Sequence, residues 1–345
     1  MPRLITVHTP EELSRWDDAG SVPNVSPTDF LRHHPDAHLL LLAPGGSIAG
    51  RCSLWWSQAP VVPGQRVGLL GHYAAFDAAS GQTLLERACE QLAELGCTLA
   101  LGPMDGSTWR PYRLITARGS EPPFFLEPDH PDEWVRHFAG AGFTPYAGYV
   151  STAVEDLAVE DPRLDGIESR LAGAGIRIRP MDRERAEADL RRIYLITCAS
   201  FQQSPFYTPL PEAEFLDLYR PLVPHVRPEL VLLAEDRDGP VGFLFGIPDL
   251  LQGRRGVPVD TVIVKTLAVV PGRRAAGLGG LLVARCHEAA RRLGLSRAIH
   301  ALMHEDTVSR NICAERARPI RRYALFARSI REPARECCRF GLCSI

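Results

Sequence analysis

The stretch that decides the fold runs from residue 264 to residue 294 and reads VKTLAVVPGRRAAGLGGLLVARCHEAARRLG. It begins inside an apolar run, Val262–Val270, that is rich in β-branched residues and too continuous for an edge strand. Pro271 ends this run, and a glycine-rich turn then leads into an amphipathic pattern that continues to Arg292. The stretch therefore predicts a central strand, a tight turn and a long helix.

The predicted turn has the composition of an anion-binding site. Gly277, Gly279 and Gly280 allow unusual backbone dihedrals and let a ligand approach the backbone closely. The N–H groups of the first helical turn have no intrahelical partners and lie at the positive end of the helix dipole, which suits a phosphate or pyrophosphate. Neither a GxGxxG motif followed by an acidic residue nor a GK[ST] motif is present. An ordinary glycine-rich loop is the alternative interpretation.

The sequence repeats a pattern of elements at an offset of about 190 residues. Two short strands joined by a turn are predicted at residues 38–56 and again at residues 229–249. An amphipathic helix that ends in Leu-Gly is predicted at residues 84–96 and again at residues 282–294, each time before an apolar strand. Two pairs in the same order indicate a tandem duplication.

Each repeat reads helix, hairpin, strand, helix, strand. This order predicts an α/β (α+β) fold with two tandem domains, each a mixed and largely antiparallel sheet flanked by helices. The joint is expected within residues 154–175, which are acidic, contain glycine and show weak periodicity. We therefore expect a first domain at residues 1–165 and a second at residues 166–345.

Composition narrows the class of protein. The chain is 45% hydrophobic and 23% charged with a net charge of −2, which argues against general binding to nucleic acid or to anionic membranes. It has no apolar run of the length of a membrane span and no signal-peptide core at its start, so a cytoplasmic protein is expected. The nine cysteines include no CxxC pair. Cys337, Cys338 and Cys343 cluster without an evident fourth ligand, so we expect no metal site.

The string LAVVPGRRAAGLGGLL resembles the cofactor-binding motif of the GNAT (GCN5-related N-acetyltransferase) superfamily: an apolar strand, a proline, Arg or Gln, two residues, then Gly-x-Gly. The segments GPVGFLFGIPD and LGPMDGSTW extend the similarity, over most of the chain, to an uncharacterised family of proteins with two GNAT-like halves. The resemblance implies that acetyl-CoA lies between two diverging strands, with its pantetheine arm along one strand and its pyrophosphate on the turn. The cofactor-binding residues so implied are Leu267, Ala268, Val269, Arg274, Ala275, Ala276, Gly277, Leu278, Gly279, Gly280 and Asn311.

Only the second half carries this motif. In the first half Phe76 stands at the position of Arg274, and Ala79 at the position of Gly277. Asp77 adds a negative charge that would repel a pyrophosphate. We therefore expect one cofactor per chain.

The catalytic residues are less evident. Lys265 occupies the strand position at which many relatives carry a glutamate base, and a lysine acts as a base only when its pKa is lowered. A pair with a carboxylate, or a contact to an anionic group of the acceptor, are the alternatives. Relatives also carry a tyrosine that protonates the leaving thiolate, but Arg318 stands seven residues after Asn311. Tyr323 is the nearest tyrosine and the second candidate.

The acceptor is expected to contact the segment between two helical patterns at residues 194–215. Phe201, Phe206 and Tyr207 interleave there with Gln and Pro, as in a pocket wall, or alternatively as a core-packing or interface loop. Glu214 and His225 are further candidates for a base.

The resemblance implies an N-acetyltransferase in which the amine of a small molecule or peptide attacks the thioester of acetyl-CoA directly. Direct attack requires orientation, a polarised carbonyl and the loss of one proton. A non-catalytic acyl-CoA-binding or regulatory protein is the alternative, because the strand glutamate is missing. Aminoacyl transfer, which other tandem GNAT-like proteins perform, is a further alternative. The sequence leaves the acceptor open, as well as the choice between monomer and homodimer.

Overall fold

A computed structural model of the protein describes residues 2–16, 22–158, 163–202, 204–272, 275–306 and 316–330. Contacts divide these residues into two compact units. Unit 1 comprises the described residues up to Leu114, His130–Tyr146 and those from Leu325 on, and unit 2 comprises the described residues of Ile115–Asp129 and Ala147–Ala324. Each unit includes residues that are remote in sequence, and the division at residue 165 stays a prediction.

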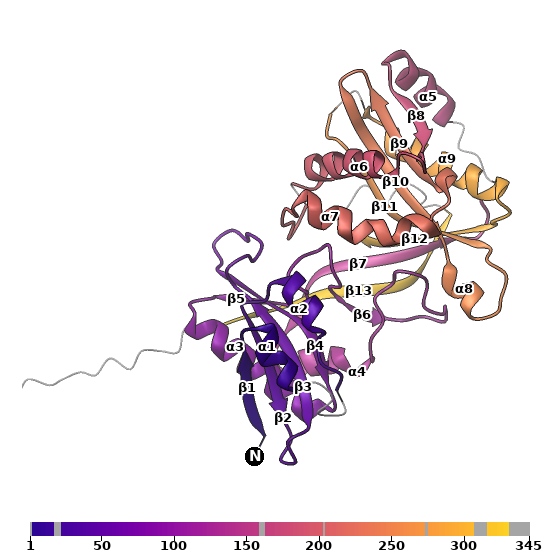
Figure 1. The fold of residues 1–345 in the computed structure, drawn as a ribbon. Coiled ribbons are helices and arrows are strands. Elements are labelled where there is room, and N and C mark those ends of the chain that lie inside the picture. Colours follow the sequence, from indigo (N-terminus) through magenta and orange to yellow (C-terminus); the bar gives the residue numbers. More distant parts are fainter. Residues whose placement is uncertain are drawn as a thin grey trace, which may run out of the picture. The chain divides into compact units, whose positions relative to one another are not determined.

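Unit 1 is built around strands in the order β1-β2-β3-β4-β5-β13, all antiparallel except the pair β4 and β5 (Figure 1). The long helix α3 packs on β3 and β4 with one apolar face. Its elements are β1 (Arg3–Val7), α1 (Pro10–Leu13), the 3-10 helix η1 (Ser14–Trp16), α2 (Pro27–His33), β2 (Ala37–Leu42), β3 (Ile48–Trp55), β4 (Val67–Ala75), α3 (Ala78–Glu94), β5 (Leu99–Gly102) and α4 (Glu133–Gly140).

Unit 2 contains strands in the order β7-β12-β11-β10-β9-β8, antiparallel except for the pair β11 and β12 (Figure 1). Helix α6 packs on β10 and β11, and α9 packs on β9, β10 and β11. Its elements are α5 (Arg163–Gly173), β8 (Arg177–Pro180), α6 (Ala186–Phe201), α7 (Glu212–Tyr219), the 3-10 helices η2 (Arg220–His225) and η3 (Pro228–Leu230), β9 (Val231–Asp236), β10 (Gly239–Pro248), α8 (Leu250–Arg254), β11 (Thr261–Val269), α9 (Leu278–Arg292) and β12 (Arg297–His304).

Three strands contribute residues to both units. They are β6 (Leu114–Ala117), β7 (Thr144–Val154) and β13 (Ala317–Ser329). The order hairpin, strand, helix, strand occurs twice, as β2-β3-β4-α3-β5 and as β9-β10-β11-α9-β12, and the last two strands are parallel each time. The predicted hairpins, the predicted central strand and both predicted helices are therefore confirmed, as is the mixed, largely antiparallel α/β class.

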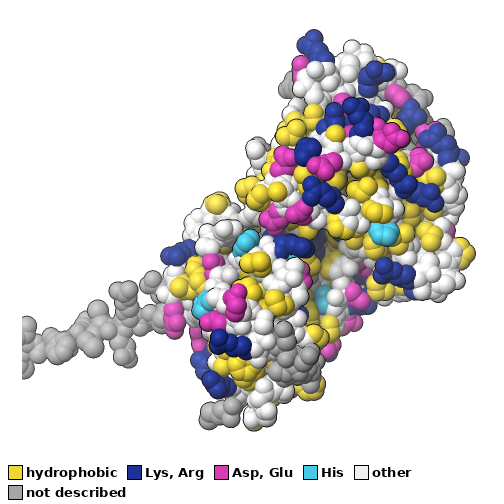
Figure 2. Space-filling model, viewed as in Figure 1, with side chains coloured by type: hydrophobic (Ala, Val, Ile, Leu, Met, Phe, Trp, Pro, Cys, Tyr) yellow, Lys and Arg dark blue, Asp and Glu magenta, His cyan; other side chains and the backbone are white. Residues whose placement is uncertain are grey.

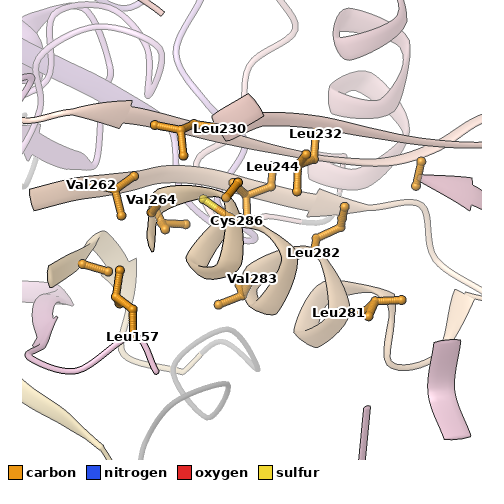
Figure 3. Packing of buried hydrophobic residues seen from close by; sticks show 14 of the residues in the cluster. Leu157, Leu230, Leu232, Leu244, Val262, Val264, Leu281, Leu282, Val283 and Cys286 are labelled. Atoms are coloured by element: carbon orange, nitrogen blue, oxygen red, sulfur yellow. The ribbon is translucent and has the colours of Figure 1, made fainter. Parts of the chain in front are cut away.

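The core of unit 2 lies between α9 and the strands (Figure 3). Leu278, Leu282 and Cys286 are fully buried, and their spacing of four residues places them on one face of the helix. They meet the alternate strand residues Val262 and Val264, which point to the same side of β11. Burial of each leucine contributes about 2–3 kcal/mol, so this face fixes α9 against β11.

The viewed face of the molecule shows basic and acidic side chains mixed over its surface (Figure 2). Such mixing creates no extended field of one sign on that face, as the net charge of −2 leads one to expect. Of the helices in the described part of the chain, none is both long and apolar enough to span a bilayer.

Candidate active site

Two neighbouring strands of unit 2 separate part-way along their length. β11 and β12 pair in parallel from Thr261 with Arg297 to Val264 with His300, and there the ladder ends although both strands continue. A pocket of about 170 Å³ lies where they separate. The residues that line it are Phe201, Val264, Lys265, Thr266, Leu267, Val283, His300, Ala301, Leu302, Met303 and His304.

Each of the two strands carries an irregularity at the point of separation. On β11 the register with β10 shifts between Val264 and Thr266, which leaves Lys265 as the extra residue. On β12 the register with β7 shifts between His300 and Met303. Leu302 within that shift has φ +60°, in the left-handed region. Bulges of this kind bend a strand and increase its twist, and here they coincide with the point at which β11 and β12 separate.

Beyond Val264, β12 no longer pairs with this edge of β11. The N–H of Val270 donates to the carbonyl of Val241 on β10 at 2.9 Å. Because successive N–H groups of a strand point to opposite edges, those of Val269 and Leu267 point toward the edge that β12 has left. This edge offers a ladder of donors and acceptors to an extended ligand.

The turn into α9 depends on Gly277. This residue is the N-cap of the helix with φ +80°, and a Cβ there would lie 2.9 Å from Cγ2 of Ile167 on α5. Any other residue would suffer backbone strain and a clash. Since a glycine cap has no side chain, it leaves the first N–H groups of α9 to other partners. Ala275, Ala276, Leu278, Gly279 and Gly280 complete the described turn, whereas Arg274 and Asn311 lie outside the described residues.

Lys265 contributes a positive charge to the pocket. Its Nζ donates to the carbonyl oxygen of Leu126 at 3.0 Å, and Leu126 belongs to the segment Ile115–Asp129 of unit 2. Among the described residues that line the pocket, none is a carboxylate. The described wall therefore offers no acidic side chain as a base, and its fixed charge is positive.

Tyr323 lies deeper. Its side chain is 2% exposed, its hydroxyl donates to the Glu127 carboxylate, and its oxygen lies 3.0 Å from Oγ of Ser151. Burial, reinforced by the nearby Glu127 carboxylate, raises the pKa of Tyr323. The fully buried Arg321 guanidinium pairs with Glu127 at 2.8 Å. Tyr323 is not among the residues that line the pocket.

Two buried histidines lie beside the pocket. Nε2 of His300 on β12 is 3.1 Å from Nε2 of His287 on α9. Burial lowers the pKa of His300 to about 4 and that of His287 to about 3, so both rings are neutral at pH 7. One ring nitrogen must therefore donate and the other accept.

The three predicted acceptor residues occupy different places. Phe201, at the end of α6, lines the pocket. Phe206, with φ +62°, and Tyr207 lie in the loop after α6 and are not part of the described lining. Burial raises the pKa of Tyr207 to about 12.

Several pocket and network residues were not predicted from the sequence, namely Glu127, Ser151, His287, His300 and Leu302. They come from four separate elements or loops, and no local spacing connects them. The His-x₃-His spacing at residues 300–304 was the one local signal for a polar strand at the pocket.

The corresponding strands of unit 1 do not separate. After β4 and β5 pair up to Leu69 with Leu101, the N–H of Met104 donates to the carbonyl of Leu70 at 2.7 Å. A Cβ on Gly71 would lie 2.2 Å from the carbonyl oxygen of Met104, so the backbones are in close contact.

The helix after β4 also differs from α9 at its N-terminus. Asp77 is the N-cap of α3, and its carboxylate accepts from the N–H of Ser80 at 2.7 Å. This hydrogen bond lowers the pKa of Asp77. The helix end that would meet a phosphate is thus capped by a carboxylate of its own.

No family model matches the chain, and no curated protein matches it. Solved structures do match. A GCN5-related N-acetyltransferase from Anabaena variabilis is 9% identical with a TM-score of 0.53, over 95% of this chain and 73% of that chain. A conserved protein from Enterococcus faecalis, a probable N-acyltransferase, is also 9% identical with a TM-score of 0.53, over 96% of this chain and 73% of that chain. A glucosamine N-acetyltransferase region of a fungal multi-domain GH3 β-N-acetylglucosaminidase is 14% identical with a TM-score of 0.52, over 95% of this chain and 38% of that chain.

At these identities the likeness is one of fold, and it extends along nearly the whole chain, in agreement with a two-domain arrangement. The resemblance predicted from residues 267–279 is confirmed at that level. The chain has the fold of the GCN5-related N-acetyltransferases.

Proposed function

We propose that the protein is an acyltransferase that uses acetyl-CoA to acetylate an amine of a small molecule or peptide, with unit 2 as the active part. The observation that carries the proposal is the separation of β11 and β12 beyond Val264 and His300, directly before the glycine turn at Gly277. The fold of the solved relatives supports acyl transfer in general.

The residues present fit acetyl-CoA. The free edge of β11 at Leu267–Val269 suits the amides of a pantetheine arm, and the N–H groups of Leu278, Gly279 and Gly280 suit a pyrophosphate. The absence of a side chain at Gly277 leaves that backbone accessible. Arg274 and Asn311 are proposed to add contacts to the cofactor. When bound, acetyl-CoA would supply an activated acetyl group.

The chain's own groups would orient the acceptor and polarise the carbonyl group that it attacks. The N–H of Val269, on the edge of β11 that β12 no longer pairs with, would stabilise negative charge that develops on a carbonyl oxygen. We assign Lys265 to acceptor binding and to the fixation of Leu126, because its Nζ is already a donor to that carbonyl. Phe201 would form the apolar part of the acceptor wall, with Phe206 and Tyr207 nearby in sequence.

Unit 1 is proposed to bind no cofactor, because its strands remain hydrogen-bonded and Asp77 caps α3. The repeated order of elements supports a tandem duplication after which the first copy lost this site.

Calorimetric titration of acetyl-CoA tests the proposal. The wild type should bind, and Gly277→Asp should bind at least 100-fold more weakly, because a carboxylate would repel the pyrophosphate and strain the turn. Ala79→Asp is the matched control, since it places the same charge at the corresponding exposed position of unit 1. It should leave the affinity unchanged.

A wild type that does not bind, or a loss of binding in Ala79→Asp, would overturn the assignment of the site. Release of free CoA with a panel of amines then tests turnover. If acetyl-CoA binds tightly but no amine leads to release of free CoA, the protein is a non-catalytic acyl-CoA-binding protein and not an enzyme.

A further inference from the structure

The bulge of β12 is connected to the buried interior of unit 2 by a chain of hydrogen bonds. The N–H of Leu302 donates to Oγ of Ser151 on β7 at 2.9 Å. Ser151 Oγ lies 3.0 Å from the hydroxyl oxygen of Tyr323 on β13, and that hydroxyl in turn donates to the Glu127 carboxylate. The chain therefore runs from the pocket wall to a fully buried ion pair.

The direction of each proton in this chain follows from the donors available. An ionised carboxylate only accepts, so the Tyr323 hydroxyl proton points at Glu127. The Tyr323 oxygen is then free to accept from the Ser151 hydroxyl, and the Ser151 oxygen accepts from Leu302. Arg321 donates bonds of 2.8 and 3.1 Å to the two oxygens of Glu127 and so holds this carboxylate in place.

The chain acts on an unfavourable backbone conformation. Leu302 is a non-glycine residue in the left-handed region, which costs about 1 kcal/mol or more and persists only where the surroundings enforce it. Leu302 also lies in the register shift of β12, and this residue lines the pocket. A hydrogen bond to the Leu302 N–H therefore stabilises the shape of the pocket.

We infer that Ser151 and Tyr323 are positioning residues, which hold the β12 bulge and thereby the gap for the pantetheine arm, and that Tyr323 does not protonate the leaving thiolate. The part of the inference that concerns ligand binding rests on the proposed function. Tyr323 acts through Ser151 and Leu302, and its proton serves Glu127.

The test compares Ser151→Ala and Tyr323→Phe with the wild type by two measurements. Hydrogen exchange followed by mass spectrometry reads the peptide around Leu302 without any ligand. Calorimetry reads the affinity for CoA itself, which has no acyl group to transfer. Tyr73→Phe is the matched control, because it removes another buried tyrosine hydroxyl, one that is hydrogen-bonded to His137 at 2.9 Å in unit 1.

The expected result is exchange at Leu302 at least tenfold faster in Ser151→Ala and several-fold faster in Tyr323→Phe, with CoA affinity reduced about tenfold in both. Tyr73→Phe should show neither change. Should Ser151→Ala not fold, Tyr323→Phe alone decides, with peptides of β4 as internal reference.

The inference is overturned if Tyr323→Phe leaves both exchange and CoA affinity at wild-type values and instead slows turnover most for thioesters of high thiol pKa, as expected for a lost general acid. A wild type that does not bind CoA would refute the proposed function, whereas the exchange data would still decide the role of the bulge.

Discussion

The N–H of Met104 donates to the carbonyl oxygen of Leu70 at 2.7 Å, and this hydrogen bond closes in unit 1 the gap that is open in unit 2. The same order of strand, helix and parallel strand therefore leads to paired strands in unit 1 and to separated strands in unit 2. In unit 2 the strands separate at two bulges. In unit 1 β4 also has a register shift, between Gly71 and Ala74, but its backbone remains in contact with that of Met104 at Gly71. A chain of this kind should hold one cofactor.

The stoichiometry of binding follows. Calorimetry or native mass spectrometry should find one CoA per chain. Asp77→Ala should not add a second, because removal of the cap leaves the closed strands unchanged, although loss of the cap should cost about 1 kcal/mol of stability. Two bound CoA molecules per wild-type chain would contradict this account of unit 1.

Replacement of Lys265 should alter binding more than proton transfer. Lys265→Met keeps the length of the side chain but removes the donor to Leu126. With an amine identified by screening, we expect a higher acceptor KM, kcat reduced less than about tenfold, and an unchanged shape of the pH–rate profile. Lys265→Arg retains the charge and should recover part of the acceptor affinity.

A different outcome would restore Lys265 as a base. Loss of the acid limb of the pH profile in Lys265→Met, with kcat lower by 10²-fold or more, would be that outcome.

The buried pair of Glu127 and Arg321 should be strongly coupled. Both side chains are fully buried, so Glu127→Gln leaves an uncompensated charge and should destabilise unit 2 by about 3–5 kcal/mol. The double variant Glu127→Gln/Arg321→Met should be less destabilised than the sum of the two single variants. Urea unfolding, followed by hydrogen exchange of unit 2 peptides, measures this. Tryptophan fluorescence is not used, because all five tryptophans belong to unit 1. Additive effects would mean that the pair is not coupled.

Acid should destabilise unit 2 through its histidine pair. Because burial lowers the pKa of His300 to about 4, the unfolded chain takes up a proton near pH 6.5 that the folded chain refuses until about pH 4. Stability is therefore fully present above pH 6.5 and falls as the pH drops toward 4, at up to about 1.4 kcal/mol per pH unit for this residue. His287, with its pKa lowered to about 3, adds a loss of the same sign.

His300→Gln should reduce the slope of stability against pH by about one proton between pH 6 and pH 4.5. Urea unfolding at each pH, followed through hydrogen exchange of α9 peptides, measures this slope. Met303→Leu, a change in the same pocket that removes no titratable group, serves as the control. An unchanged slope in His300→Gln would show that the ring is already protonated in the folded state.

Local patterns in the sequence were sufficient for the elements and for the fold. The apolar run at Val262–Val270 became β11, the pattern up to Arg292 became α9, and Gly277 adopts the left-handed conformation that the glycine turn suggested. These features depend on residues a few positions apart, and their period or composition is visible in one window.

The candidate site was predictable only where it is local. Lys265 was recognised by position, but its partner Leu126 was not, because the segment Ile115–Asp129 that contains Leu126 lies far from β11 in sequence. Tyr323 was placed in the site by its nearness to Asn311, and the structure instead shows it bonded to Glu127 and Ser151. Hydrogen bonds between such remote residues have no periodic signature, since only the tertiary fold brings them together.

The hydrogen bond between Glu127 and Tyr323 has a consequence for how the chain folds during its synthesis. Tyr323 lies 196 residues further along the chain than Glu127, so most of unit 2 is synthesised before that hydrogen bond can form. The sheet of unit 1 is also incomplete until the end of synthesis, because the last residues of β13 pair with β5. In the sheet β13 lies between β5 and β7, so a chain that is still attached to the ribosome before β13 emerges exposes an unpaired edge on each of these two strands. Such edges make nascent chains prone to aggregation or dependent on a chaperone.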